Sequence, residues 1–322
     1  MIRELKGMHN YAKVILLLSV LTFISGLLSS FLGELFLPFS SGIFAALLLF
    51  ENPKKRIFSY VVPISTFAIS IAVNGIYGIV SLNYAAIALI IYLCYIRSVS
   101  KAECSIYVTI TASLFIIFSL YLSAATTIGS FEFNEVANYF LELYQELKEY
   151  LIGSVKEYYS SVPEANQSFS AETIEIYFDS LSNILVSIIG IIAFVITGIS
   201  IKLFTKLALH YSKNGILKSF AHFIPSAFAA YAYIALTVIS IFITKNTILN
   251  SAIINASNIL MVVFVYIGIQ YILLTGKLAN RKSTVYTFIA ISLLVIPSIA
   301  LQIVSYLGVW LILAAKNVDR TI

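Results

Sequence analysis

Apolar stretches of about 20 residues, separated by short loops rich in lysine and arginine, recur along most of this chain. A helix needs about 20 such residues to cross the hydrocarbon core of a bilayer. Hydrophobic residues make up 60% of the 322 residues, and charged residues only 11%. A soluble domain carries about a quarter charged residues, so this composition excludes one. The sequence predicts an all-α, polytopic transmembrane helix bundle with about nine or ten membrane segments.

The apolar stretches define the order of the predicted spans. Eight are well delimited, at residues 14–32, 35–50, 57–80, 84–96, 105–127, 181–201, 220–244 and 251–275. The last stretch, residues 284–315, would form a helix about 48 Å long, whereas the hydrocarbon core is about 30 Å thick. It is either one tilted crossing or two segments that break near Pro297-Ser298 or Tyr306-Leu-Gly308. Lys316 and Arg320 favour two segments, because lysine and arginine concentrate in cytoplasmic loops.

The distribution of charge predicts how the spans are oriented. Residues 131–180 hold ten acids and two bases, a local charge of −8, although the whole chain is +5. Most of the bases lie in short loops on the other side of the predicted membrane. This positive-inside pattern predicts a multi-pass protein of the plasma membrane with a cytoplasmic N-terminus and with residues 131–180 outside. The expected contact surface is the lipid bilayer, and nucleic acid is not an expected partner.

The chain is expected to fold in three parts, which are an N-terminal membrane bundle (1–130), an acidic insertion (131–180) and a C-terminal membrane bundle (181–322). Within the insertion, apolar residues recur every three or four positions between glutamates, which predicts an amphipathic, extracytoplasmic helix. That helix is interpreted either as a lid or docking helix or as a plain connector between the two bundles. A shorter helix is expected to start near Ser170 and to lead into the next span.

Residues that catalysis would require are not found at the spacing it needs. The histidines at 9, 210 and 222 have no histidine or carboxylate at metal-ligand spacing, and Cys94 and Cys104 match no metal or redox motif. No phosphate-binding loop of the form Gly-x-x-x-x-Gly-Lys-Ser/Thr is present, so the chain is not expected to hydrolyse nucleotides by itself. We therefore expect no enzyme activity, no cofactor and no bound metal.

A set of polar residues lies near the outer ends of the predicted spans. Its candidate ligand-binding members are Glu34, Asn74, Asn255, Asn258 and Gln302. Asn255 and Asn258 are three residues apart and therefore share one helix face, and Asn74 opens the stretch Asn74-Gly-Ile-Tyr-Gly78. Such a set suits a small, polar, hydrogen-bonding ligand that enters from outside. The alternative interpretation is that interfacial water solvates these side chains and that they hold no ligand.

Small residues recur every fourth position in the first span, at Thr22, Gly26 and Ser30. Such a row permits close contact between helices in lipid. It would pack either against a neighbouring span of the same chain or against a partner membrane subunit.

The layout of about five spans, an acidic insertion and four or five further spans resembles the YybS-like family of bacterial multi-pass membrane proteins. The segment Ile216–Pro225, which enters a span through a proline, and the motifs Gly268-Ile-Gln270 and Tyr306-Leu-Gly308 carry the local likeness. The chain departs from the family after the last motif, where Val309-Trp-Leu311 stands in place of an early aspartate. The N-terminal half of the family is similar to substrate-binding components of energy-coupling-factor transporters, so the resemblance implies a role in transport.

Two functions are therefore predicted. The first is a transport-related protein, an outward-opening small-molecule-binding or permease subunit that is energised by a separate membrane coupling subunit and ATPase. The second is a non-transporting envelope scaffold or regulatory protein that acts through the acidic outer helices.

Overall fold

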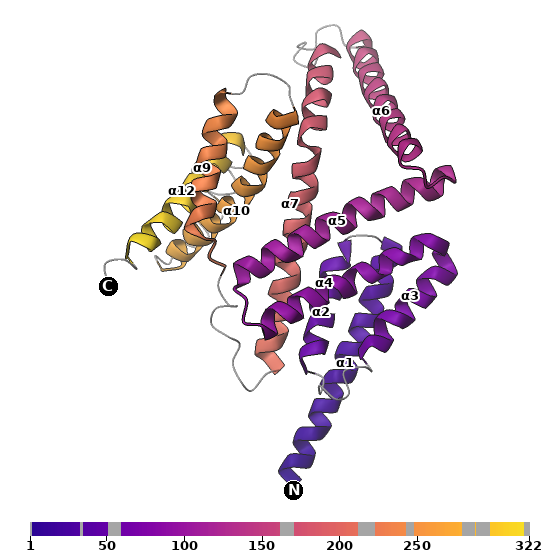
Figure 1. The fold of residues 1–322 in the computed structure, drawn as a ribbon, viewed down its shortest axis with the longest axis vertical. Helices are drawn as coiled ribbons and strands as arrows, with labels where there is room; N and C mark the ends of the chain where they lie inside the picture. The colour runs from indigo at the N-terminus through magenta and orange to yellow at the C-terminus, as the bar shows by residue number, and fades with distance from the viewer. Residues whose placement is uncertain are drawn as a thin grey trace. The chain divides into compact units, whose positions relative to one another are not determined.

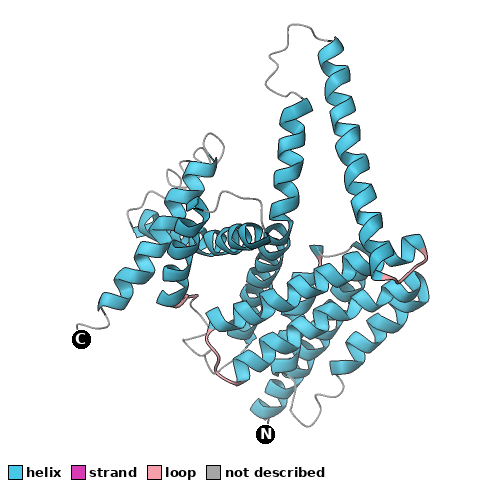
Figure 2. Cartoon of the chain, turned by 45° about the horizontal axis from the view of Figure 1, so that its top comes forward, coloured by secondary structure: helices cyan, strands magenta, loops and turns pink. Residues whose placement is uncertain are grey.

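The structure is a computed structural model that describes residues 2–32, 35–50, 59–161, 171–211, 223–242, 248–278, 287 and 297–318. Within these ranges the chain forms ten α-helices and one 3-10 helix, and it forms no strand (Figures 1 and 2). The predicted all-α class is therefore confirmed. The helices are α1 (Ile2–Leu32), α2 (Leu37–Phe50), α3 (Val61–Asn74), η3 (Gly75–Leu82), α4 (Asn83–Ile96), α5 (Lys101–Ile128), α6 (Phe133–Ser161), α7 (Ala171–Tyr211), α9 (Ala227–Phe242), α10 (Ile248–Leu278) and α12 (Pro297–Val318).

Apolar helical segments account for the predicted spans. Among the described residues, five are long and apolar enough to cross a membrane, at Ala12–Ser29, Gly78–Ile96, Lys101–Ile128, Ile184–His210 and Leu249–Thr275. Four more are apolar but shorter, at Leu37–Phe50, Val61–Asn74, Ala227–Ser240 and Ile299–Ala314. The polytopic helical architecture follows from these segments. The amphipathic helix α6 belongs to neither group.

The last span begins where one of the two predicted breaks lies. α12 starts at Pro297, a position that suits the first turn of a helix because proline has no amide hydrogen to donate there. Tyr306-Leu-Gly308, the other predicted break, lies inside α12. The apolar residues before Pro297 lie almost entirely outside the described residues, so whether they form a separate membrane segment stays a prediction.

The described helices divide into two compact units. The first unit comprises Met1–Ser180 with Ile192–Phe223, and the second comprises Leu181–Ile191 with Ile224–Ile322. The long helix α7 therefore contributes its middle part to the second unit and its two ends to the first. The predicted three-part division of the chain stays a prediction.

The core of the first unit is formed mainly by α2 and α4, with α1 and α3 packed beside them. Phe44 and Tyr84 are fully buried and meet edge to face, with ring centroids 5.9 Å apart. Gly26 of the first-span row lies under the Tyr84 ring, where an added Cβ would come within 2.9 Å of the ring. At this position the row of small residues serves packing within the chain. The C-terminal part of α7 joins this unit through a hydrogen bond of 2.8 Å between the hydroxyls of Ser41 and Ser200.

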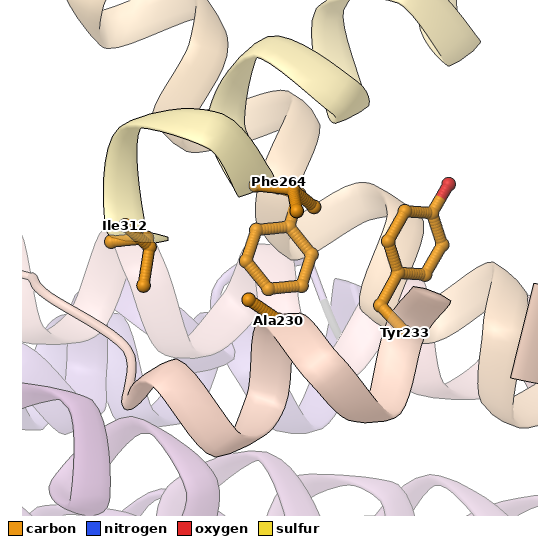
Figure 3. Packing of buried hydrophobic residues seen from close by; sticks show 5 residues of the cluster. Ala230, Tyr233, Phe264 and Ile312 are labelled. Carbon is orange, nitrogen blue, oxygen red and sulfur yellow. The ribbon is translucent and has the colours of Figure 1, made fainter. Parts of the chain in front are cut away.

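The core of the second unit is formed by α9, α10 and α12. Its buried cluster consists of Ala230, Tyr233, Phe264, Val309 and Ile312, and Figure 3 shows the Phe264 ring between Ile312 and Tyr233. α10 and α12 approach so closely that a Cβ added at Gly268 would lie 2.3 Å from the Val304 carbonyl oxygen. A Cβ at Gly308 would lie 2.1 Å from the Phe264 carbonyl oxygen. Both glycines thus permit backbone contact between the two helices, as small residues do in membrane bundles.

Candidate functional site

The third predicted span departs from a single regular helix. Its α-helical part ends at Asn74, and the eight residues Gly75–Leu82 continue as the 3-10 helix η3. Gly75 adopts φ +59°, a backbone conformation that residues with a side chain rarely take. Runs of 3-10 helix longer than about four residues are uncommon and often mark a hinge or a functional site. η3 is therefore the most unusual backbone element of the first unit.

Close packing holds η3 against the helix that precedes it. A Cβ added at Gly78 would lie 2.5 Å from the backbone of Ser70 and Ile71, so only glycine fits at that contact. η3 also neighbours α1, α4 and α5, which surround it within the first unit. The residues of η3 are thus placed at the meeting point of four helices.

Buried polar side chains occur on η3 and on the helices that contact it. They include Thr22, Ser25 and Ser29 on α1, Thr66 and Ser70 on α3, Ser81 on η3, Asn83 and Tyr84 on α4, and Ser119 on α5. We refer to these residues as the η3 polar set. No member carries a formal charge at neutral pH. The set can therefore offer hydrogen bonds to a neutral molecule, but it offers no counter-charge to an ion.

Four members of the η3 polar set link neighbouring helices to one another. The hydroxyls of Thr66 and Tyr84 are 2.8 Å apart, which links α3 to α4. The Asn83 Nδ2 donates to the Ser119 Oγ at 3.2 Å and links α4 to α5. Each bond satisfies polar atoms that would otherwise be costly to bury.

The hydroxyls of Ser70 and Ser81 differ from the rest of the set because they have no hydrogen-bond partner among the described residues. Ser70 is 0% and Ser81 is 1% exposed, yet neither hydroxyl oxygen has a hydrogen-bond partner among the described residues. A buried hydroxyl without a partner costs about 1–3 kcal/mol, so each of these two calls for an explanation. A bound polar molecule that hydrogen-bonds to them would remove this cost.

The sequence matches one family over nearly its whole length. That family is described as predicted membrane protein (DUF2232), and the match covers residues 14–310. The chain belongs to this family. No curated protein and no solved structure matches this chain.

The predicted site residues fall in both units of this family member. Glu34 lies outside the described residues, and Asn74 is half-buried at the boundary between α3 and η3 in the first unit. Asn255, Asn258 and Gln302 lie in the second unit, the first two on α10 and the third exposed on α12. Their role in binding a ligand stays a prediction.

Asn255 has a visible structural role. Its side chain is 7% exposed, and its Oδ1 accepts a hydrogen bond of 2.8 Å from the backbone amide of Ser187 on α7. Its Nδ2 donates to the Ser251 carbonyl oxygen at 2.7 Å. The Oδ1 end of the amide therefore ties α10 to the middle part of α7, and the Nδ2 end bonds to the backbone of α10 itself. Asn258, one turn farther along, is half-buried.

Sequence reasoning did not select Ser70 and Ser81. Serine is common in membrane helices, where it hydrogen-bonds to its own backbone, so a single serine carries little signal. The spacing of Thr66 and Ser70 by four residues does place both on one face of α3. Ser81, however, becomes notable only because η3 is a 3-10 helix.

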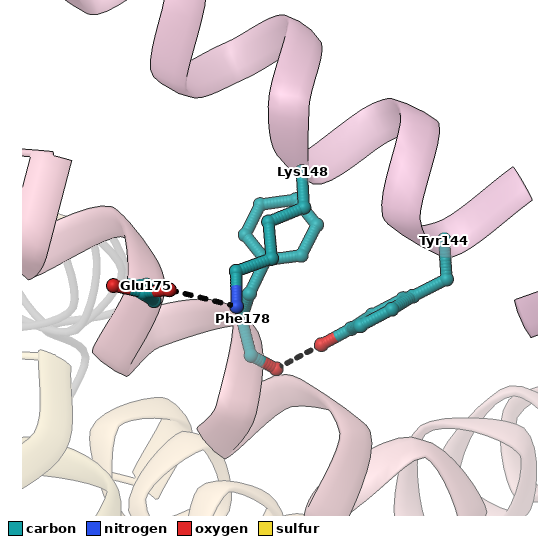
Figure 4. A network of polar contacts seen from close by, with 4 residues as sticks. All are labelled: Tyr144, Lys148, Glu175 and Phe178. Atoms are coloured by element: carbon teal, nitrogen blue, oxygen red, sulfur yellow. Dashed lines mark hydrogen bonds and ion pairs between the residues drawn. The ribbon is translucent and has the colours of Figure 1, made fainter. Parts of the chain in front are cut away.

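A second group of polar contacts lies outside the apolar segments, between α6 and the first turns of α7 (Figure 4). The Lys148 Nζ lies 3.4 Å from the Glu175 Oε1. The Tyr144 hydroxyl donates to the Phe178 carbonyl oxygen, and the two rings pack with centroids 5.3 Å apart. These contacts hold the middle of α6 against the N-terminal part of α7.

Groups that commonly hold metals are not assembled in the described part of the chain. Among those residues, no three histidine, cysteine, aspartate or glutamate side chains lie together. Cys94 and Cys104 are both buried and free of disulfide bonds. Among the described residues, no such group therefore indicates a metal site.

Proposed function

We propose that this protein is a transport-related membrane protein that binds a small, neutral, polar molecule, with no catalytic step of its own. The observation that carries the proposal is the pair of unpartnered hydroxyls, Ser70 and Ser81, within the η3 polar set. Such groups match a ligand that both donates and accepts hydrogen bonds. The resemblance of the N-terminal half to substrate-binding components of energy-coupling-factor transporters supports the same function.

Energy for transport would come from another protein. The sequence contains no phosphate-binding loop for ATP. A separate coupling subunit and an ATPase in the plasma membrane would supply the driving force, and the charge distribution supports a cytoplasmic N-terminus. The five residues that the sequence predicts to bind a ligand, Glu34, Asn74, Asn255, Asn258 and Gln302, stay a separate prediction.

Purification followed by mass spectrometry of small molecules tests the proposal. We expect the wild-type protein in mild detergent to carry a neutral, polar compound, which denaturation releases. The double variant Ser70→Ala, Ser81→Ala should lose that compound. The matched control Ser123→Ala, an exposed serine on α5 of the same unit, should retain it. Equal recovery from all three proteins, or recovery of none from any, would contradict binding at the η3 polar set.

A second function is favoured by the contacts of α6. This helix is fixed against α7 through Lys148 and Tyr144, while large apolar side chains such as Leu147 and Tyr150 stay exposed. That arrangement supports an envelope scaffold or regulator that acts through its outer helices.

Co-purification after mild solubilisation separates the two functions. Recovery of an ATPase together with a membrane coupling subunit favours transport. Recovery of other envelope proteins favours the scaffold, provided that the recovery depends on the exposed apolar residues of α6. If the same proteins are recovered after those residues are made polar, the scaffold proposal fails.

A further inference from the structure

The surface of α6 carries three parallel rows of side chains. Glu142, Glu146 and Glu149 are exposed and recur at intervals of four and three residues. One position farther along the sequence, Leu143, Leu147 and Tyr150 repeat the same spacing, and Leu151 extends the row. One position farther again, Tyr144 and Lys148 face α7. Because residues three or four apart share one face of a helix, each row forms a continuous stripe.

The middle row is an apolar surface that no described residue covers. Leu143 is 47%, Leu147 is 49%, Tyr150 is 71% and Leu151 is 37% exposed. The pattern i, i+4, i+7, i+8 is the one that amphipathic helices use to bind one another. We call these four residues the α6 apolar row, and the three glutamates beside it the α6 acid row.

The bilayer does not fit this surface. The Lys148–Glu175 ion pair fixes the middle of the row beside Glu175 of α7. The apolar segment of α7 starts at Ile184, nine residues or about 14 Å of helix farther along. The α6 apolar row therefore lies beside a part of α7 that precedes its apolar segment. Helices that lie on membranes also carry lysine and arginine on their polar face, whereas this row is flanked by glutamates.

A second copy of the chain does not fit it either. α6 contains five glutamates and two lysines and is therefore net negative. Pairing two such helices would bring like charges together, which opposes the association. The one lysine close to the row, Lys148, already pairs with Glu175.

We propose that the α6 apolar row, with its acid row, binds an amphipathic helix of another protein in which an apolar stripe is flanked by lysine or arginine. Such a helix would bury its stripe on Leu143, Leu147 and Tyr150 and place its bases next to the glutamates. This inference rests on the second proposed function and specifies the chemistry of the partner. The charges supply orientation and rate of association, and the apolar row supplies the buried area.

Two synthetic helical peptides test this inference on the full chain in nanodiscs of phosphatidylcholine. Both carry leucine at i, i+3, i+4 and i+7; one has lysine at the flanking positions and the other has glutamate. Binding of the labelled peptides is measured by fluorescence anisotropy, with empty nanodiscs as the blank. We expect the lysine peptide to bind the protein at least about tenfold more tightly than the glutamate peptide, and to bind more weakly as salt increases.

Variants of exposed residues locate the binding surface. Leu143→Gln with Leu147→Gln should weaken binding of the lysine peptide by about tenfold, because it removes two central apolar contacts. Leu141→Gln is the matched control, since Leu141 is 60% exposed on α6 but lies outside the row, and it should leave binding unchanged. Glu146→Lys with Glu149→Lys should reverse the preference between the two peptides.

Several outcomes would overturn the inference. One is tighter binding of the glutamate peptide than of the lysine peptide. Another is a loss of affinity in the Leu141→Gln control as large as in the variant with Leu143→Gln and Leu147→Gln. A third is no binding of either peptide. A dimer in sedimentation velocity that Leu147→Gln dissociates would make a second copy the occupant. None of these results bears on the scaffold function itself, which fails separately if co-purification is independent of the α6 apolar row.

Discussion

Replacement of Gly308 by alanine should destabilise the second unit, because this glycine lies against the backbone of α10. The added Cβ would sit 2.1 Å from the Phe264 carbonyl oxygen, whereas ordinary van der Waals contact begins at 3.4 Å. α10 and α12 would have to separate by about 1.3 Å, the difference between these distances, along the most extensive contact between described helices. The atom in the way belongs to the backbone, so rotation of a side chain cannot relieve the clash.

The expected magnitude combines two opposing effects. Overpacking of a close contact costs about 1–3 kcal/mol, and a clash with backbone falls at the upper end. Alanine in place of glycine within a helix raises the free energy of unfolding by about 1 kcal/mol, because alanine restricts the conformations of the unfolded chain. Gly308→Ala should therefore lower the free energy of unfolding by about 2 kcal/mol. Gly268→Ala should have a similar effect, since its Cβ would lie 2.3 Å from the Val304 carbonyl oxygen.

Thermal unfolding in mild detergent, followed by the fraction of monodisperse protein that remains after heating, measures this effect. The matched control is Gly198→Ala on α7, where an added Cβ meets nothing within 4 Å. The control should unfold at the wild-type temperature or above, and Gly308→Ala several degrees below it. A Gly308→Ala protein as stable as the control would refute close contact between α10 and α12.

Three further predictions concern other elements. Asn255→Leu should lower stability by about 1 kcal/mol, because it removes the acceptor for an α7 backbone amide, whereas Asn258→Ala should have a smaller effect in the same assay. In a background without Cys94 and Cys104, Ser154→Cys should react with a membrane-impermeant thiol reagent in intact cells, and Ser212→Cys only after lysis. The opposite result would invert the orientation. Ser100→Ala removes half of the capping box at the start of α5 and should cost about 1 kcal/mol, which circular dichroism during heating would reveal as an earlier transition.

The helices most accessible to prediction are those whose apolar stretch ends in charged residues or glycine. α5 is an example, since it is bounded by the Ser100–Glu103 capping box and by Gly129 at φ +73°. The amphipathic period of the acidic insertion likewise places α6, because apolar and acidic residues alternate at helical spacing. In both cases the local sequence contains the signals that begin and end the helix.

Features that depend on contacts between distant segments could not be predicted in this way. The residues of η3 are as apolar as those of α3, so hydropathy merges the two into one span, and only the contact of Gly78 with Ser70 reveals the change of helix type. The partner of Asn255 is Ser187, 68 residues away, and nothing near either residue indicates the pairing. A polar residue in an apolar stretch therefore signals a buried contact without identifying it.

Ser70 and Ser81 differ from the buried polar groups that already have partners, and this difference directs the search for a ligand. In the second unit, both ends of the Asn255 amide are hydrogen-bonded to backbone groups. The hydroxyls of Tyr233 and Ser305 lie 3.0 Å apart. These groups already have partners, so a ligand would gain little by displacing them. In the first unit, by contrast, Ser70 and Ser81 lack partners among the described residues. Replacing Asn255 should consequently reduce stability without changing which small molecule co-purifies, whereas replacing the two serines should remove the molecule and leave the fold intact.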